Sequence, residues 1–341
     1  MNNLNSFNLP QNAMPPTGAV VVPALTSHDS PAELPVCELP VCELPVCELP
    51  AAEMAGLLRN TSQAATPLQL PLTLIQPHAV DPISSLRELV KHVDLLRFLV
   101  RREIKVRYAQ SAIGIGWAVL QPLFPMLIFT VIFGRLAKLS SDGIPYALFS
   151  FAGLVPWLYF SNGVTDGVNS LIANANMLSK VYFPRLLIPL SAVISRFIDF
   201  CVATVILLGM MVWYGTMPNM GVCVIPWLLA MMILTTIGIA CWLSTLAIQY
   251  RDVKHALSFL IQVFMYTAPV VYPTTLIPES WQLLYALNPM VGVMEGLRSA
   301  LFGTRDMPWT LVFIGSLSSL AIAYSGTSYF VRKQRIFADV A

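Results

Sequence analysis

The chain has 341 residues, of which 56% are hydrophobic and only 11% are charged, and its mean hydropathy is +0.68. Because soluble globular proteins carry about 25% charged residues, this composition excludes an ordinary soluble domain and predicts an integral membrane protein. The net charge of +2 is too small to indicate nucleic-acid binding. The six cysteines and four histidines follow no spacing typical of a disulfide framework or a zinc site, so we expect no bound metal.

Residues 1–80 are predicted to be a disordered, low-complexity tail. They are rich in Pro, Ala, Leu, Ser and Thr, and the pentapeptide ELPVC recurs in tandem. A proline in every repeat prevents both a helix and a central strand. A metal or thiol cluster at Cys37, Cys42 and Cys47 is disfavoured, because a five-residue spacing scatters the thiols around a polyproline helix. No cleavable signal peptide is predicted, and a downstream start at Met54 is a hypothesis.

An amphipathic helix is predicted from about residue 84 to residue 107. Apolar residues recur at three- and four-residue steps from Leu86 to Val100, and charged residues, most of them basic, fill the positions between them. A helix with a basic face suits the membrane interface, and the bilayer-length segment that follows favours this interpretation over an ordinary surface helix. The basic residues expected to act at the interface are Arg97, Arg101, Arg102, Lys105 and Arg107.

Six apolar segments are long enough to cross a bilayer, which takes about 20 residues. They are approximately residues 113–133, 146–168, 186–214, 222–248, 256–272 and 309–331. Prolines inside them are tolerable because neighbouring helices and water can satisfy the freed carbonyls. The predicted fold class is therefore an all-α membrane protein with six transmembrane helices.

Lys and Arg are distributed unevenly between the two sides of these crossings. The segments before the first crossing, between the second and third, between the fourth and fifth, and after the sixth are richer in basic residues than the alternate segments. By the positive-inside rule the richer segments are cytoplasmic. Both termini are therefore predicted to lie on the cytoplasmic side, as an even number of crossings requires.

Six polar residues lie within or near the crossings: Asn162, Asp166, Asn169, Arg196, Asp199 and Gln262. Such groups are costly in lipid and usually face the protein interior. Arg196 and Asp199 are three residues apart and are predicted to neutralise each other, a structural role that we favour over a proton relay. Asp166 is expected near the inner end of the second crossing, where water can reach it.

The loop of residues 177–189, MLSKVYFPRLLIP, lies between two long apolar segments. It carries Lys180 and Arg185, with the aromatic residues Tyr182 and Phe183 immediately before Pro184. A short loop with these residues belongs at the cytoplasmic face. We interpret it as the docking element for a soluble partner.

Residues 273–306, between the fifth and sixth crossings, fit neither a tight turn nor a full crossing. Pro278 and Pro289 divide this largely apolar stretch into two pieces. Two re-entrant half-helices that dip into the outer leaflet are predicted, as protein or a water-lined cavity can cover such backbone. Glu295 and Arg298 are three residues apart and are predicted to pair on one helix face.

No motif for nucleotide binding or hydrolysis occurs in the chain. The Walker loop G-x-x-x-x-G-K-[ST], H-E-x-x-H and G-x-S-x-G are all absent, so we expect no catalytic residues and no ATP binding of the Walker type. Aromatic residues are plentiful in the crossings. They fit either interface belts and helix packing or a stack of rings that lines a path for sugars, and the sequence leaves both interpretations open.

The order of short motifs resembles one known family. The motifs are Arg107-Tyr108, Gly114-x-Gly116-Trp117, Gln121-Pro122, Lys180-x-x-Phe183-Pro184-Arg185, Tyr250-Arg251-Asp252-Val253, Leu287-Asn288-Pro289-Met290, Glu295-Gly296-x-Arg298 and Phe337-Ala338-Asp339. They resemble the membrane subunit of ABC-2 type polysaccharide exporters, the permeases for O-antigen, capsule and teichoic acid. The similarity covers residues 81–341, which form the predicted transmembrane domain, and does not extend to the tail.

This resemblance implies a homodimer in the inner membrane above two separate ATPase subunits, which carry ATP and Mg, so that this chain binds no cofactor. The dimer would enclose a tunnel for a lipid-linked glycan. Residues 174–185 would form the coupling helix, and residues 276–302 the outer gate. The implied coupling residues are Leu178, Lys180, Tyr182, Phe183, Pro184 and Arg185. The implied path residues are Trp117, Phe124, Phe259 and Tyr266, and the gate residues are Trp281, Asn288, Pro289, Glu295 and Arg298.

Three other functions compete with polysaccharide export. An ABC-2 permease for a drug or another lipid fits the same crossings. An intramembrane enzyme that transfers sugars to a polyprenyl carrier would need charged groups clustered at one membrane face, whereas those of this chain are dispersed along the sequence. A scaffold without transport would explain neither the prolines within the crossings nor the gate-like segment. The sequence leaves the glycan, its lipid carrier and any chain-end requirement open.

Overall fold

The computed structural model describes residues 88–334, except residues 110, 112, 175–176, 178–182, 217–219 and 251. The chain divides into two compact units, Met1–Leu74 and Ile75–Ala341. The predicted tail with its ELPVC repeats lies outside the described residues, so its disorder stays a prediction. All regular structure in the described part of the second unit is helical, which confirms the predicted all-α class.

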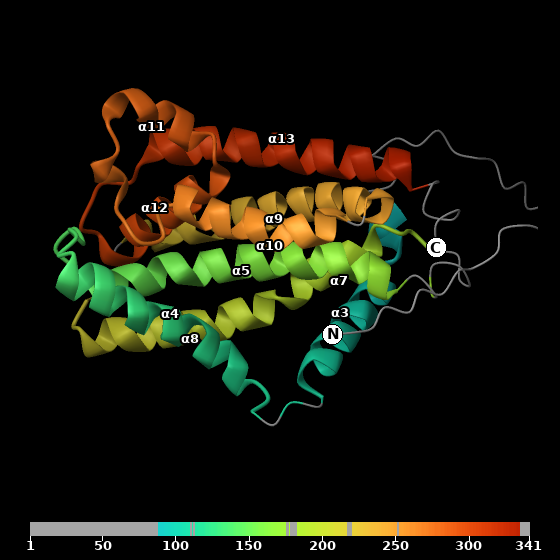
Figure 1. Cartoon of the computed structure of the whole chain (residues 1–341), viewed down its shortest axis with the longest axis horizontal. Helices are drawn as coiled ribbons and strands as arrows, with labels where there is room; N and C mark the ends of the chain where they lie inside the picture. Colours follow the sequence, from blue (N-terminus) through green and yellow to red (C-terminus); the bar gives the residue numbers. More distant parts are fainter. Residues whose placement is uncertain are drawn as a thin grey trace, which may run out of the picture. The chain divides into compact units, whose positions relative to one another are not determined.

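Ten α-helices and three shorter helical turns have defined bounds in this part (Figure 1). They are α3 (Val93–Tyr108), α4 (Gly116–Phe129), the π-helical turn η1 (Thr130–Leu136), α5 (Tyr146–Ala173), α7 (Leu187–Ser195), α8 (Phe197–Trp213), the 3-10 turn η2 (Met220–Val224), α9 (Ile225–Gln249), α10 (Asp252–Thr267), the 3-10 turn η3 (Thr274–Leu276), α11 (Glu279–Ala286), α12 (Pro289–Phe302) and α13 (Trp309–Lys333).

Five helical segments are long and apolar enough to cross a membrane: Gly116–Leu136, Tyr146–Ala173, Leu187–Trp213, Gly221–Gln249 and Trp309–Lys333. They match the first four predicted crossings and the sixth. The predicted fifth crossing corresponds to α10, which has 16 residues. A bilayer-spanning helix takes about 20 residues, so the total of six crossings stays a prediction.

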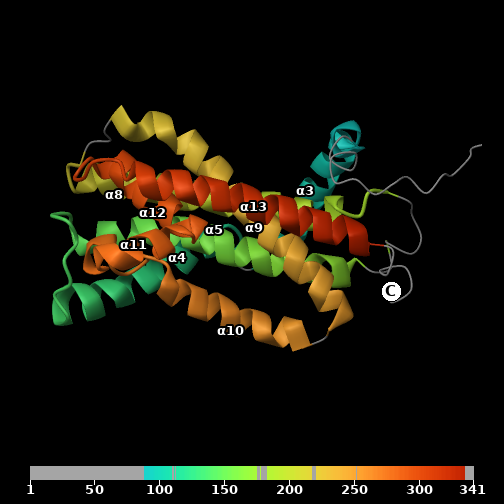
Figure 2. The same cartoon turned by 90° about the horizontal axis from the view of Figure 1, so that it is seen from above.

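Helix α5 is the centre of the bundle. It contacts α4, α7, α8, α9, α10 and α12, and 83% of its most apolar 18-residue window is buried, against 17–33% for the other candidate spans. A helix that is apolar on all sides is covered either by other helices or by lipid, and α5 is covered by other helices. Figure 2 shows α4 and α10 on one side of α5 and α13 on the other. The other helices are therefore arranged around a single buried axis.

Close backbone contact joins α9 to α13. A Cβ atom added at Gly326 would collide with the carbonyl oxygen of Gly238, and one added at Gly238 would lie 2.6 Å from the carbonyl oxygen of Ile322. Without side chains at these two positions, the helix backbones can approach directly, which is a common way to associate helices in membranes. This contact fixes α13 along the length of α9.

The segment after α10 forms two short helices, as predicted, although their depth in the membrane stays a prediction. Helix α12 begins with Pro289, and the side chain of Asn288 accepts a hydrogen bond from the Met290 amide at 3.1 Å. This is a standard N-cap followed by proline at the first helical position. Helix α12 ends at Gly303, which has a φ of 62°. All of α12 is buried, whereas α11 is largely exposed.

The ends of the bundle differ in content (Figure 1). Helix α3, the end of α5, the start of α7 and the end of α13 lie together at one end, which we call the α3 end. Helices α11 and α12 lie at the opposite end, which we call the α11 end. The predicted interface helix and docking loop are therefore neighbours, and the predicted gate helices are remote from both.

Candidate functional site

Helix α3 presents its basic residues in two ways. Arg97, Arg101 and Lys105 are exposed, whereas Arg102 and Arg107 are partly buried against the bundle. The helix packs on α7 with Leu99 buried. The amphipathic helix is therefore confirmed over Val93–Tyr108, whereas its predicted start at about residue 84 lies outside the described residues. Two of its five basic side chains are partly buried against the protein.

Arg102 connects α3 to the start of the predicted docking loop. Its guanidinium donates a hydrogen bond to Oδ1 of Asn174 at 2.6 Å and lies 3.7 Å from Sδ of Met177. Asn174 is the residue after α5, and its amide donates to the Ser170 carbonyl at 2.8 Å. Because the guanidinium donor is charged, the Arg102–Asn174 hydrogen bond is stronger than one between two neutral groups. The end of α5 and α3 are thereby held together.

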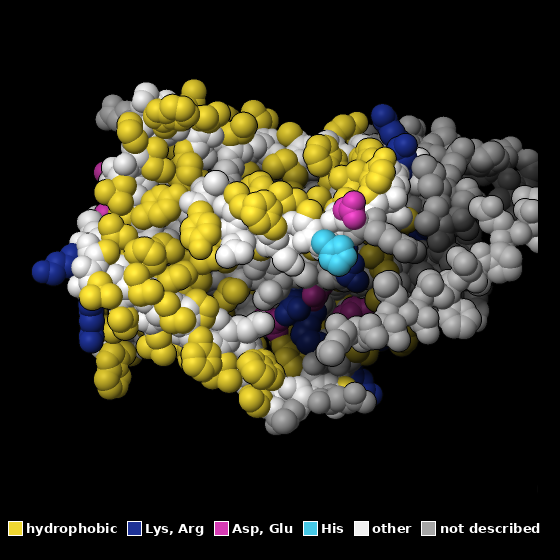
Figure 3. Space-filling view, in the orientation of Figure 1, with side chains coloured by type: hydrophobic (Ala, Val, Ile, Leu, Met, Phe, Trp, Pro, Cys, Tyr) yellow, Lys and Arg dark blue, Asp and Glu magenta, His cyan; other side chains and the backbone are white. Residues whose placement is uncertain are grey.

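Two arginines and two aspartates from different helices form what we call the arginine–aspartate network. Arg107 lies 2.8 Å from Asp166 and 3.5 Å from Asp199, and Arg196 lies 2.6 Å and 3.0 Å from the same carboxylates. Their side chains are only 14–26% exposed. Figure 3 shows basic and acidic side chains together at the base of a hollow between α3 and α4. Each aspartate thus accepts from both arginines.

The network lies at a break in the third candidate span. Helix α7 ends at Ser195 and α8 begins at Phe197. Arg107 donates to the Ser195 hydroxyl at 2.9 Å and to its carbonyl oxygen at 3.5 Å. A side chain that takes a carbonyl out of the helical hydrogen-bond ladder is a recognised cause of a kink. The third predicted crossing is confirmed as one candidate span, Leu187–Trp213, whose helix is interrupted at Arg196 between α7 and α8.

Tyr108 adds a neutral donor to the network. Its hydroxyl donates to Asp199. Burial and this hydrogen bond raise the pKa of Tyr108 to about 12. The hydroxyl therefore keeps its proton at neutral pH and satisfies the carboxylate without adding charge.

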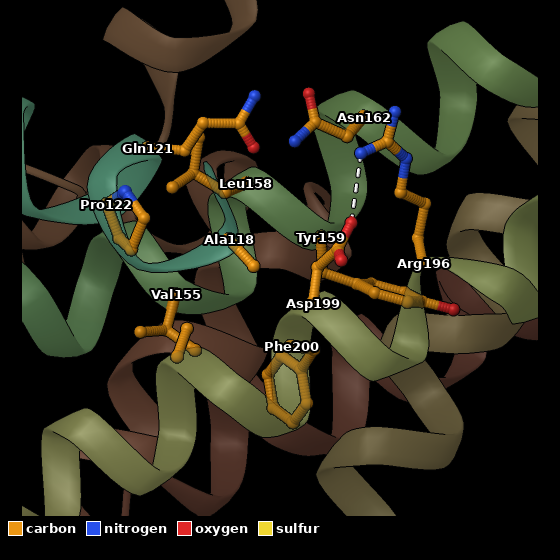
Figure 4. A pocket seen from close by; sticks show the side chains of 11 residues that line it. Ala118, Gln121, Pro122, Val155, Leu158, Tyr159, Asn162, Arg196, Asp199 and Phe200 are labelled. Atoms are coloured by element: carbon orange, nitrogen blue, oxygen red, sulfur yellow. Dashed lines mark hydrogen bonds and ion pairs between the residues drawn. The ribbon is translucent and has the colours of Figure 1, made fainter. Parts of the chain in front are cut away.

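A small pocket lies next to the network, between α4, α5 and α8 (Figure 4). Figure 4 shows the side-chain amides of Gln121 and Asn162 pointing toward one another on the side of the pocket where Arg196 lies. The cavity volume is about 20 Å³, which is enough for roughly one water molecule. A single copy of the chain thus provides a polar niche here and not a passage for a sugar.

The predicted path residues are all on the surface of the single chain. Trp117 and Phe124 of α4 are 51% and 58% exposed, and Phe259 and Tyr266 of α10 are both 67% exposed. Gln262 of α10 is also exposed, although an interior position was expected for it. None of the four aromatic residues lines the pocket between α4, α5 and α8. A path along them would therefore need a second wall.

The predicted coupling residues are described only in part. Leu178, Lys180 and Tyr182 lie outside the described residues. Phe183 is partly buried against an apolar cluster formed at the α3 end. Pro184 follows it, and Arg185 donates a hydrogen bond to the carbonyl oxygen of Gln334 after α13. The described end of the loop is therefore attached to the last helix of the bundle.

The predicted pair at the α11 end is confirmed. Arg298 lies 3.0 Å from Glu295, and their side chains are 5% and 7% exposed. The guanidinium also donates to the carbonyl oxygens of Val270 at 2.9 Å and Phe149 at 3.4 Å, and its central carbon lies 3.8 Å from the centre of the Phe149 ring. Arg298 thus holds α12 against α5 and the turn after α10. The predicted gate residue Trp281 is 61% exposed on α11.

Comparison with known proteins identifies the architecture. The profile of the family described as ABC-2 type transporter matches residues 94–302, which is more than half of the chain. This range begins within α3 and ends with α12. It therefore contains the arginine–aspartate network, the docking loop and the Glu295–Arg298 pair.

Several characterised proteins are similar over most of their length. The chain is 31% identical over 249 residues to the O-antigen export system permease protein RfbA of Klebsiella pneumoniae, covering 72% of this chain and 95% of that protein. It is 28% identical over 259 residues to the protein of the same name from Myxococcus xanthus, covering 75% and 99%. It is 27% identical over 209 residues to the polysialic acid transport protein KpsM of Escherichia coli, covering 59% and 79%. The chain therefore belongs to the ABC-2 type transporter family.

Proposed function

We propose that this chain is the membrane subunit of an ABC transporter that exports a cell-surface polysaccharide. The observation that carries the proposal is the match to O-antigen export permeases over 95–99% of their length. ATP would be hydrolysed on a separate subunit, which binds ATP and Mg. This chain would be a permease and not an enzyme.

The α3 end is the proposed contact with the ATPase. The docking loop begins beside Asn174, which Arg102 of α3 holds, and its described end is tied through Arg185 to Gln334 after α13. A force on the loop would therefore reach α3, α5 and α13 together. The attachment of the docking loop to these helices favours a cytoplasmic position for the α3 end. Both termini would then lie in the cytoplasm, and the protein would lie in the inner membrane.

A second copy of the chain is the proposed second wall of the glycan path. Phe259, Gln262 and Tyr266 recur at three- and four-residue steps on one exposed side of α10. An exposed amide is costly in hydrocarbon, whereas it suits a water-lined path between two copies. A homodimer would place this side of α10, with the exposed aromatic residues of α4, along a tunnel for a lipid-linked glycan. Helices α11 and α12 would close its outer end.

Loss of the chain tests export, and two substitutions test coupling. Deletion is expected to leave glycan inside the cell, where fractionation and a glycan stain detect it. Phe183→Ala or Arg185→Glu is expected to lower surface glycan at unchanged membrane insertion, because each loosens the docking loop. Arg135→Glu, at an exposed position of η1 outside the α3 end, is the matched control for charge reversal.

Two outcomes contradict separate parts of the proposal. Normal surface glycan after deletion contradicts export by this chain. Normal surface glycan in both docking-loop variants, with the ATPase still co-purifying, contradicts the coupling role and leaves the export role intact.

A further inference from the structure

A second cavity lies on the side of α5 away from the network. It is bounded by α5, α9, α10 and α13 and has a volume of about 320 Å³. We call it the apolar groove, and its main lining residues are Phe160, Val164, Trp242, Leu260, Phe264 and Ile322. This volume is far above the roughly 10–15 Å³ that a single water molecule needs. It is in the size range of pockets that hold small organic ligands.

The lining of the apolar groove excludes a polar ligand. Ser325 has the one hydroxyl among the lining residues, and it donates to the Ile322 carbonyl at 3.2 Å. The indole N–H of Trp242 is the other side-chain donor among these residues. A polar ligand would therefore replace few of its hydrogen bonds to water, which is costly. A hydrocarbon chain has no such loss. The chemistry of the lining thus selects a ligand with a long apolar part.

The groove occupies the half of the bundle near the α3 end. Its residues on α10 run from Leu257 to Phe264, which at about 1.5 Å per residue places them roughly 8–18 Å from the start of the helix at Asp252. One leaflet of a bilayer has an apolar depth of about 15 Å. The α10 lining thus extends over about 10 Å, which is less than the depth of one leaflet, in the half of the bundle where α10 begins and α13 finishes.

Basic residues predominate at this end of the groove. Lys254 and His255 are exposed in the first turn of α10, and Arg332 is exposed beside Lys333 at the end of α13. Asp252 is the acidic residue described in the same turn of α10. Figure 3 shows apolar side chains spread over α10 and α13, with basic side chains where α13 finishes. An anionic head group would be attracted to this position.

Helix α10 is also the least embedded of the long helices that line the groove. Leu257 is its one buried residue, whereas buried residues recur along α5, α9 and α13. A ligand in the groove would add contacts between α10 and the rest of the bundle. Occupancy would therefore stabilise the position of α10.

From the groove and its basic end we infer a lipid-binding site. We propose that the apolar groove binds an acyl chain of an anionic phospholipid, with the phosphate beside Lys254 and Arg332, and that this lipid holds α10 against α13. The proposal does not depend on which substrate the protein transports.

Native mass spectrometry of the purified full-length chain tests the site. In nanodiscs of phosphatidylglycerol we expect a retained lipid and a higher Tm than in phosphatidylcholine. Leu260→Trp, which fills the groove, is expected to lose the retained lipid and the Tm difference. Leu317→Trp is the matched control, since Leu317 is 68% exposed on α13 and is not a lining residue.

A double charge variant tests the head-group contact without filling the groove. Lys254→Gln with Arg332→Gln is expected to bind both lipids equally, so that the Tm difference disappears. Equal retention of phosphatidylglycerol by the original chain and Leu260→Trp would overturn the proposal. Retention of a lipid-linked glycan in the groove would also overturn it. Cross-linking of Leu260 to a second copy of the chain would do the same, because the second copy would then be the occupant.

Discussion

Two ion-pair sites in the described part of the chain are built in opposite ways. Glu295 and Arg298 lie on one helix, are almost fully buried, and fix α12 through backbone carbonyls of other elements. The arginine–aspartate network joins α3, α5 and the α7–α8 break, is partly exposed, and gives each charge two partners. The first arrangement is a fixed attachment. In the second arrangement each arginine can keep one aspartate partner when the helices shift.

This difference determines how much stability each site loses when one charged partner is removed. A lone charge left at an almost fully buried site keeps most of its desolvation penalty, whereas a more exposed charge with a second partner keeps part of its stabilisation. The pair at the α11 end is thus expected to matter most for folding. The network at the α3 end is expected to matter most for the relation between the helices that it joins.

The largest effect is expected from Arg298→Met. Glu295 would be left buried and unpaired, and breaking one partner of a buried pair costs about 3–5 kcal/mol. Whole domains are stable by only about 5–15 kcal/mol, so a strong fall in membrane protein level and in Tm is expected. Thermal unfolding of the purified chain, monitored by tryptophan fluorescence, measures the fall in Tm.

The double variant Glu295→Gln with Arg298→Met is the control for that experiment. It leaves no unpaired charge and is expected to recover part of the lost stability, while the lost bonds to Val270 and Phe149 keep it below the original chain. If the double variant is no more stable than Arg298→Met alone, the cost does not come from an unpaired carboxylate.

An intermediate effect is expected from Asp166→Asn. Asp199 would still accept from both arginines, so the protein is expected to fold with a modest fall in Tm. A double-mutant cycle with Arg107→Gln is expected to give a coupling energy of about 0.5–3 kcal/mol, the range for residues in direct contact. The same variants are expected to lower surface glycan, because α3 is then held to α5 only by the Arg102–Asn174 hydrogen bond among the contacts described above. Additive effects would show that the Arg107–Asp166 contact contributes nothing.

The sequence predicts contacts between near neighbours well. The Glu295–Arg298 and Arg196–Asp199 pairs follow from a spacing of three residues on a helix, and both are present. The division of residues 273–306 into two pieces follows from Pro278 and Pro289, and α11 and α12 are present. These features depend on local geometry, which the chain order fixes by itself.

The links between distant elements could not be predicted in this way. Asp166 within an apolar helix signals a partner, but nothing in the spacing identifies Arg107, 59 residues away. The interruption at Arg196 lies beside a contact of the same kind, the 3.5 Å hydrogen bond from Arg107 of α3 to the Ser195 carbonyl. The crossing predicted at about residues 256–272 corresponds to α10, a helix of 16 residues, and stays a prediction.

The smallest effect is expected from Asp94→Asn on α3. Asp94 and Arg97 form an ion pair at 3.4 Å with the same spacing of three residues as Glu295 and Arg298, but their side chains are 100% and 70% exposed. Water and salt screen such a pair, and ordering two mobile side chains offsets the remaining attraction. No measurable change in Tm is therefore expected at either low or physiological salt. A fall in Tm as large as that of Asp166→Asn would mean that spacing, and not burial, determines the cost of breaking a pair in this protein.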